Sequence, residues 1–317
     1  MLKKILVVHY SQSGQLDRVT RSMLAPLEES EGFDVVYEPL QPVKPFPFPW
    51  PFFRFFDTFP ETVYDEPCPL APLVNDYSQQ DFDLVILAYQ VWFLSPSQPM
   101  AAFLQSPEAA KVLRDRPVMT LIVCRNMWLM AQEKVKNKVA GLGGRLIDNA
   151  VLTDSAHSAA TFISTPLWVL TGNKGPFLGG RIPAAGVSTK DITAARRFGE
   201  ALRVQLPTRE IGDYSPMLTG LGAVQINERL IASEQVAHRS FRIWGALLRR
   251  LGTPGSLLRR VVLVLYIVFL VSLILTVVPV LAIIKRCIAP LTREKIRAQR
   301  AYYAAPSGDD ASRWSAQ

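Results

Sequence analysis

The stretch YSQSGQ, residues 10–15, decides how the first half of this chain folds. It follows the apolar run KILVVH (4–9), which is typical of a buried strand, and precedes a segment with helical spacing over residues 14–30. The small and polar residues between them predict a strand-to-helix turn whose backbone N–H groups and hydroxyls converge on an anion. Gly14 lets the backbone approach such an anion closely. An ordinary turn with a serine cap is the alternative.

Strands and helices alternate along the rest of this part of the chain. Four more short runs rich in β-branched and aromatic residues predict strands at 33–38, 83–89, 117–124 and 145–152. Helical patterns follow at 98–113, 128–141 and 188–206, the last with Ser188 as its N-cap. The alternation predicts an α/β fold with a parallel sheet covered on both faces. Ligands of such sheets bind beyond the carboxyl ends of the strands, where the strand order reverses.

Two further loops are expected at that same edge of the sheet. QVWFLSPSQP follows the third predicted strand, and its Trp92 and Phe93 are suited to flank a planar ring. CRNMW (124–128) follows the fourth strand and again combines polar and aromatic residues. Three such loops at one edge suit a planar cofactor that carries a phosphate.

The order of these loops resembles the flavodoxin-like fold, particularly the FMN-using NAD(P)H:quinone oxidoreductases, over about residues 1–207. The resemblance implies a five-stranded sheet in the order 2-1-3-4-5 with FMN as cofactor, and it leaves NAD(P)H open. The FMN contacts it implies are Ser11, Gln12, Ser13, Gly14, Gln15, Gln90, Val91, Trp92, Phe93, Arg125, Asn126 and Met127. Two features depart from the family. Leu16 stands where a hydroxyl residue is usual, which makes Gln15 a substitute phosphate ligand, and the stretch 154–187 exceeds an ordinary connection.

A narrower resemblance covers the whole chain. With its PWPFFRFFDTFPE, CRNMW and YYAAPSG segments, the chain resembles the flavodoxin-like dialkylresorcinol condensing enzymes. That resemblance implies oxidation, and so aromatisation, of a lipophilic cyclohexanedione to a dialkylresorcinol, with a ketosynthase or an acyl carrier protein as partner. An NAD(P)H:quinone reductase and a non-catalytic scaffold for the ketosynthase are the alternatives.

The predicted catalytic residue is a histidine. Aromatisation removes a proton and a hydride; a flavin accepts the hydride, and histidine is the default acceptor for the proton near neutral pH. Among the three histidines, His157 follows the fifth strand and is the candidate, with a surface histidine as the bland alternative. The cysteines Cys68, Cys124 and Cys287 are far apart, so neither a disulfide framework nor a metal site is predicted.

A proline-rich and aromatic insertion is predicted at residues 41–74. Eight aromatic residues fall between Phe46 and Phe59, and five prolines at alternate or near-alternate positions precede most of them. We expect the rings to sit on an extended or irregular loop, because proline excludes a regular helix or a central strand. This loop is either a lid on the sheet or an apolar collar that receives an alkyl chain or enters a bilayer.

The C-terminal third carries a different pattern. Residues 208–257 predict a linker and an amphipathic interfacial helix, whose apolar face could instead pack within the domain or against another molecule. Residues 258–285 predict a transmembrane helix and 286–317 a basic tail. The uncharged run Val261–Ile284 has 24 residues, and a helix of that length, about 36 Å, is long enough to cross a bilayer. Residues 221–300 hold 13 Lys and Arg against 3 Asp and Glu, whereas residues 1–220 hold 21 against 22.

This charge distribution favours a lipid bilayer and not nucleic acid as the partner, because the basic excess flanks the apolar run. Residues 1–14 contain only a short apolar stretch with no small-residue cleavage site behind it, so we expect no secretory signal. We therefore expect a protein of the bacterial inner membrane with its catalytic domain on the cytoplasmic side, and leave a homodimer open. A single span, with the tail on the far side, is preferred to a re-entrant path that bends near Pro279.

Overall fold

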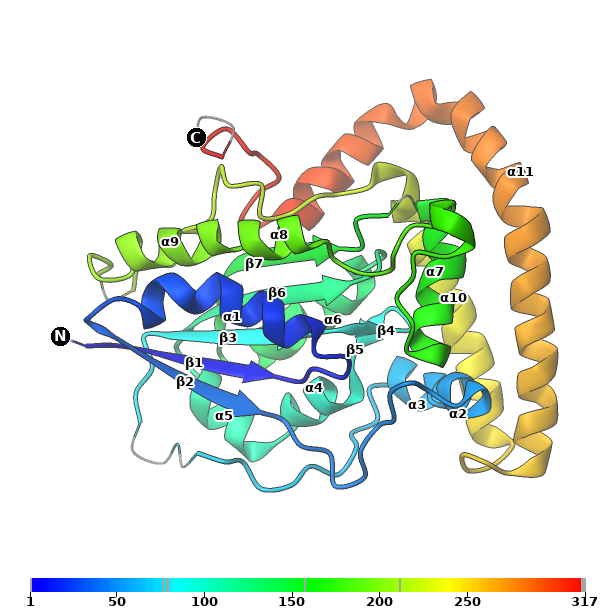
Figure 1. The fold of residues 1–317 in the computed structure, drawn as a ribbon, viewed down its shortest axis with the longest axis horizontal. Coiled ribbons are helices and arrows are strands. Elements are labelled where there is room, and N and C mark those ends of the chain that lie inside the picture. The colour runs from blue at the N-terminus through cyan, green and yellow to red at the C-terminus, as the bar shows by residue number, and fades with distance from the viewer. Residues whose placement is uncertain (1, 76, 78–79, 157, 211, 315–317) are drawn as a thin grey trace.

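The computed structural model describes residues 2–75, 77, 80–156, 158–210 and 212–314 (Figure 1). Its centre is a five-stranded parallel sheet in the spatial order β2-β1-β3-β6-β7. The strands are β1 (Lys3–His9), β2 (Phe33–Pro39), β3 (Leu84–Tyr89), β6 (Pro117–Cys124) and β7 (Arg145–Thr153). This is the order 2-1-3-4-5 of a flavodoxin-like sheet, and all five predicted strands are confirmed. Strand order reverses between β1 and β3, so their carboxyl ends mark the expected ligand edge.

Helices cover both faces of the sheet (Figure 1). On one face lie α1 (Gln15–Glu28), α8 (Thr189–Ala194) and α9 (Arg196–Gln205). On the other lie α4 (Gln98–Phe103), α5 (Pro107–Leu113) and α6 (Leu129–Gly141). Helices α1 and α9 pack so closely that a Cβ atom on Gly199 would lie 1.8 Å from the Met23 carbonyl oxygen. Every residue of β3 is buried, as expected for a central strand.

Two predicted helical regions are divided, and one helix was not predicted. The pattern at 98–113 divides into α4 and α5, because Pro107 has no N–H to continue a helix and Ser106 caps the new one, accepting from the Ala109 amide at 3.2 Å. The pattern at 188–206 divides at Ala195 into α8 and α9, with Ser188 as the N-cap of α8 as predicted. The stretch 154–187 contains a helix that was not predicted, α7 (Ser158–Thr171), and the short 3-10 turn η1 (Leu178–Gly180).

The aromatic insertion is helical in its second half, so the prediction of an irregular loop is wrong there. Helices α2 (Phe52–Asp57) and α3 (Phe59–Val63) begin after the proline-rich run, with Pro51 as the N-cap of α2. The next proline, Pro60, lies in the first turn of α3, where a missing N–H costs no hydrogen bond. A short hairpin, β4 (Val91–Trp92) with β5 (Ser95–Pro96), contacts this insertion.

The C-terminal third is part of the same folded unit. Helix α10 (Glu228–Arg250), capped by Asn227, packs against α3 and α6, and α11 (Leu257–Ala304) follows it. Met217 and Leu218 are buried, and so is Tyr303 near the end of α11; all three belong to the main core. The folded domain therefore extends well beyond residue 207.

One segment of the described residues is long and apolar enough to cross a membrane. It comprises Leu257–Val277 at the start of α11, with mean hydropathy 2.7, and 11% of its most apolar window is buried.

Candidate functional site

The loop between β1 and α1 presents free backbone donors. Gly14 caps α1 in the left-handed conformation, with φ 73°, and no side chain caps the helix. Within the described part of the chain, no acceptor pairs with the amide N–H groups of residues 12–16, whereas the Ser11 hydroxyl accepts from the Asp17 amide at 3.3 Å. The space beyond Gly14 is open, because a Cβ atom there would meet nothing within 4 Å. The loop therefore has the geometry of an anion site at a helix N-terminus.

Two cations, Arg18 and Lys174, lie close enough to each other to interact. Arg18 is in the first turn of α1, and burial together with the nearby Arg18 lowers the pKa of Lys174. The Lys174 ammonium also lies over the Trp168 ring, 4.8 Å from its centroid.

The glutamine side chains predicted as ligands bind other parts of the chain. The Gln12 amide donates to the Pro47 carbonyl at 2.8 Å. Gln15 is buried; its amide donates to the Val187 carbonyl at 3.3 Å and accepts from the Val187 N–H at 3.2 Å. The Gln15 side chain thus holds a neighbouring turn, and the loop offers an anion its backbone and the serine hydroxyls.

The aromatic residues of the 90s loop contact the insertion. Trp92 packs edge-on against Tyr10, Phe46 and Trp50, with ring centroids 5.0 to 5.9 Å apart, and Trp50 is 4% exposed. We call these four residues the aromatic cluster. It fills the region beyond the ends of β1 and β3 with side chains of the chain itself. That Trp92 flanks a planar ligand stays a prediction.

Phe93 belongs to a second group of rings. It contacts Phe55, Phe59 and Phe241 at centroid distances of 5.1, 5.7 and 6.1 Å. The backbone of Phe93 has φ 48°, which turns the hairpin toward α2 and α3. Before this turn, Gln90 donates to the Tyr10 carbonyl at 3.4 Å and Val91 pairs with Pro96. Trp92 and Phe93 therefore have different ring neighbours, and among the described residues the two groups meet only through Trp50 and Phe55, whose ring centroids are 5.8 Å apart.

The 120s loop lines a cavity of about 220 Å³. Met127 there has φ 53°, and the cavity lies between the carboxyl ends of β6 and β7 and the start of α10. Its lining comprises Arg125, Asn126, Met127, Trp128, Leu129, Thr153, Asp154, Ala156, Gln225, Ile226, Asn227, Leu230 and Glu234. Three predicted contacts, Arg125, Asn126 and Met127, are thus brought together, but with α10 and not with the 90s loop.

Arg125 and Glu234 are the two described lining residues with a buried polar atom that lacks a partner. The Arg125 Nε donates to Thr161 Oγ1 at 2.8 Å, its guanidinium lies over the Phe162 ring, and burial lowers its pKa to about 10. Glu234 is fully buried; its Oε1 accepts from the Met130 amide at 2.8 Å, and burial raises its pKa to about 8. Among the described residues, Arg125 Nη2 and Glu234 Oε2 have no hydrogen-bond partner. A cavity with one spare donor and one spare acceptor can bind a small polar ring or carbonyl compound.

Sequence reasoning missed Glu234, which lies on α10 far along the chain from the 120s loop. The signal was present in the spacing, because Glu234 follows the buried Ile231 by one helical turn and so lies on the buried face. His157, the predicted catalytic residue, lies outside the described residues.

A chain of contacts joins the cavity to the loop at residues 11–14. Asp154, in the cavity wall, accepts from the Gly186 amide at 2.7 Å. Gly186 precedes Val187, which pairs with Gln15 at the start of α1. The anion loop and the cavity are therefore two ends of one edge of the sheet.

Comparisons with known proteins give structural similarity only. No protein-family profile and no curated protein sequence matches the chain. Similar solved structures include a flavoprotein in complex with FMN from Lactobacillus acidophilus NCFM, at 16% identity and TM-score 0.37, covering 48% of this chain and 93% of that one. A flavodoxin from the domain Archaea has 11% identity and TM-score 0.33, covering 64% of this chain and 99% of that one. RosB with a bound 8-demethyl-8-formylriboflavin-5'-phosphate intermediate has 12% identity and TM-score 0.30, covering 72% and 92%.

Proposed function

We propose that this protein is a membrane-associated, FMN-dependent oxidoreductase that oxidises a lipophilic cyclic dione. The observation that carries the proposal is the loop at residues 11–14, where unpaired backbone amides and an open left-handed glycine lie at the N-terminus of α1. These features fit the phosphate of FMN. Arg125, Asn126 and Met127, at the other end of the same edge, would contact the ring. When bound, FMN would serve as the hydride acceptor.

The cavity beside α10 would hold the polar end of the substrate. Arg125 Nη2 is a free donor for a carbonyl oxygen, and Glu234 Oε2 is a free position that can accept or return a proton. Because burial raises the pKa of Glu234 to about 8, its carboxyl can exchange a proton near neutral pH. His157 remains a second candidate base.

The lipophilic part of the substrate would enter from the apolar side of the molecule. Phe52 and Phe53 on α2 are 46% and 43% exposed, and α2 contacts the exposed apolar helix α11. A dialkyl cyclohexanedione, aromatised to a dialkylresorcinol, has the required polar ring and alkyl chains. A ketosynthase or an acyl carrier protein is the proposed partner that supplies such a substrate. NAD(P)H would be the reductant only if the protein is instead a quinone reductase.

The cofactor is tested by placing a charge in the loop. Gly14→Asp adds a carboxylate where the phosphate would lie; a like charge at about 4 Å costs about 4 kcal/mol at an effective dielectric constant near 20, so we expect the Kd for FMN to rise at least about 100-fold. Gly32→Asp is the matched control, because Gly32 also has a positive φ of 101° and open space but lies at the opposite edge, before β2. Fluorescence titration with FMN measures both. Equal affinity in the two variants, or no FMN binding by the parent protein, would overturn the proposal.

The substrate is tested by anaerobic reduction of the FMN-loaded protein. Bleaching of the flavin spectrum by a dialkyl cyclohexanedione alone supports aromatisation. Bleaching by NADPH and not by the dione supports a quinone reductase instead, and bleaching by neither supports the scaffold.

A further inference from the structure

The first half of α11 exposes an apolar surface that nothing in the described chain covers. Leu257, Leu265, Val268 and Leu275 are 59% to 78% exposed, on a segment with mean hydropathy 2.7. A surface of this length and apolarity has the dimensions of a membrane helix. Basic side chains described on its two flanks are Arg249, Arg250, Arg260, Arg293, Lys295 and Arg297. Apolar surface between basic flanks fits a bilayer with anionic headgroups.

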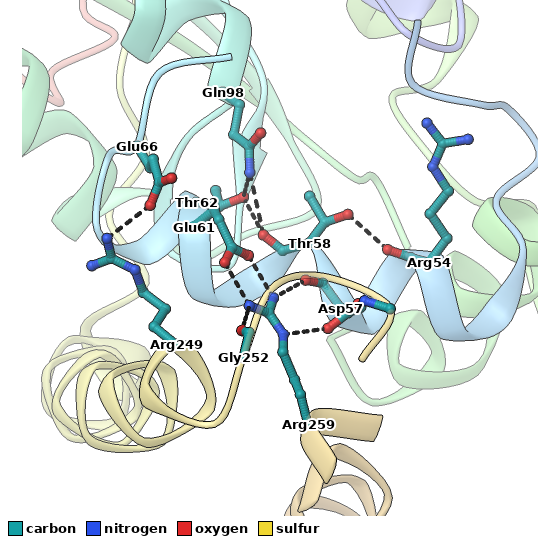
Figure 2. A network of polar contacts seen from close by, with 11 residues as sticks. Arg54, Asp57, Thr58, Glu61, Thr62, Glu66, Gln98, Arg249, Gly252 and Arg259 are labelled. Carbon is teal, nitrogen blue, oxygen red and sulfur yellow. Dashed lines mark hydrogen bonds and ion pairs between the residues drawn. The ribbon is translucent and has the colours of Figure 1, made fainter. Parts of the chain in front are cut away.

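The leading end of α11 is fixed to the insertion (Figure 2). Arg259 is 1% exposed and makes five hydrogen bonds, two to the Glu61 carboxylate at 2.7 Å each, two to Asp57, and one to the Gly252 carbonyl. The Gly255 backbone amide donates to the second carboxylate oxygen of Asp57, Oδ2, at 2.7 Å. We call this network the Arg259 clamp. It holds the first turn of α11 against α2 and α3.

The trailing end of α11 is fixed to the sheet. Ser307 is fully buried; its hydroxyl donates to Asp148 Oδ1 at 2.8 Å and accepts from the Asn149 amide at 2.7 Å, both on β7. Further along, the Gly222 amide donates to the Asp310 carbonyl at 2.7 Å. The segment after α11 is therefore an integral part of the domain.

These two attachments decide the path of the helix. A straight helix of 48 residues would be about 72 Å long, yet both ends of α11 contact one compact unit. Figure 1 shows how this is achieved, because α11 rises beside α10 and then curves back toward β7. A single span would put residues 303–314 on the far side of a hydrocarbon core about 30 Å thick. That arrangement requires Ser307 to leave its buried site on β7, so the preference for a single span is not supported.

We propose that the apolar part of α11 enters a bilayer containing anionic lipid and leaves it on the same side, with the C-terminal segment beside the sheet domain. The inference rests on the membrane association in the proposed function and is independent of the flavin. The protein is then monotopic, and its ligand edge stays at the membrane surface next to the leaflet that holds the lipophilic substrate.

The path is tested by cysteine labelling of the full chain, with the three native cysteines replaced by alanine. Thr208→Cys reports the sheet domain and Ser312→Cys the segment after α11; both positions are exposed. A membrane-impermeant maleimide is added to spheroplasts and to inside-out vesicles of expressing bacteria. We expect both cysteines to be labelled in inside-out vesicles and both to be protected in spheroplasts. Labelling of Ser312→Cys in spheroplasts, with Thr208→Cys protected, would overturn the proposal.

Fractionation and flotation separate this failure from a failure of membrane association. Leu265→Asp places a charge on the apolar face, and Val204→Asp is the matched control on α9, since the two side chains are 59% and 61% exposed. The parent protein and Val204→Asp should float with vesicles of phosphatidylcholine and phosphatidylglycerol, whereas most of the Leu265→Asp protein should stay unbound. A soluble parent protein would overturn the membrane assignment itself. Equal flotation of both variants, with Leu265→Asp changing only the oligomeric state, would identify a second copy of the chain as the occupant.

Discussion

The Arg259 clamp and the loop at residues 11–14 differ in whether their polar groups have hydrogen-bond partners. In the clamp, a fully buried guanidinium has a partner for each of its N–H groups (Figure 2). In the loop, the amides of residues 12–16 have none among the described residues. Buried polar groups must be paired, because leaving one unpaired costs about 1 to 3 kcal/mol. The clamp is thus built for stability, whereas the loop keeps its donors for a ligand.

Glu234 lies between these extremes. One carboxylate oxygen accepts a hydrogen bond from the start of α6. The other is buried without a partner among the described residues, in a side chain that lines the cavity. Such a half-paired group both holds α10 to the domain and remains available for chemistry. The three sites therefore form a series, and each can be tested by the size of its effect on stability.

The largest effect is expected at the clamp. Arg259→Ala leaves Asp57 and Glu61 close together without their cation, so we expect the free energy of unfolding to fall by about 3 to 5 kcal/mol. The neighbouring Arg260 is exposed and lies over the Phe53 ring at 5.6 Å, so Arg260→Ala should cost less than about 1 kcal/mol. Urea unfolding in detergent measures both. Similar losses in the two variants would contradict the role of the clamp.

An intermediate effect, dependent on pH, is expected at Glu234. Burial raises its folded pKa from 4.5 to about 8, so its contribution to stability is present below pH 4.5 and is lost as the pH rises toward 8. Relative to Glu234→Gln, the unfolding free energy of the parent should fall by about 2 to 4 kcal/mol between pH 5 and pH 8, since one pKa unit corresponds to about 1.4 kcal/mol. Asp148, whose pKa burial raises to about 6, titrates in both proteins and cancels in the difference. Parallel stability curves would show that Glu234 has an ordinary pKa.

The smallest effect on stability is expected in the loop. Ser13→Ala should change the unfolding free energy of the FMN-free protein by less than about 0.5 kcal/mol, because the Ser13 hydroxyl makes no hydrogen bond within the described chain. Its affinity for FMN should still fall several-fold, which a fluorescence titration reports. If Ser13→Ala lowered the unfolding free energy and left the affinity for FMN unchanged, the loop would have a structural role, as the clamp has, and not a ligand-binding one.

Much of the sheet could be predicted from the sequence because its signals are local. Each strand is a short apolar run, and the run at residues 4–9 followed by Gly14 already predicts the first strand, the turn and α1. The helical spacing on α10 and the apolar run of α11 were equally readable. The same local reasoning gave the wrong structure for residues 52–63. The prolines before residue 52 indicated a loop, but the segment itself has no proline until Pro60, which lies in the first turn of α3 and is compatible with a helix.

Contacts between distant segments could not be predicted. Trp92 looked like a ligand surface, but the insertion supplies Phe46 and Trp50 as its neighbours. The sequence analysis did not single out Glu234, because only the packing of α10 against α6 buries this carboxyl beside the cavity.

The sequence by itself determined the parallel sheet, the turn that can bind an anion and an apolar helix long enough for a membrane. The tertiary structure alone decided that this helix returns to the domain from which it leaves. The physical reason is that apolar periodicity and length determine whether a segment forms a helix. The path of that helix relative to the domain depends on hydrogen bonds between residues as far apart as Asp148 and Ser307. A buried hydroxyl paired with a carboxylate on the sheet thus fixes the end of α11 at the domain, which hydropathy could not indicate.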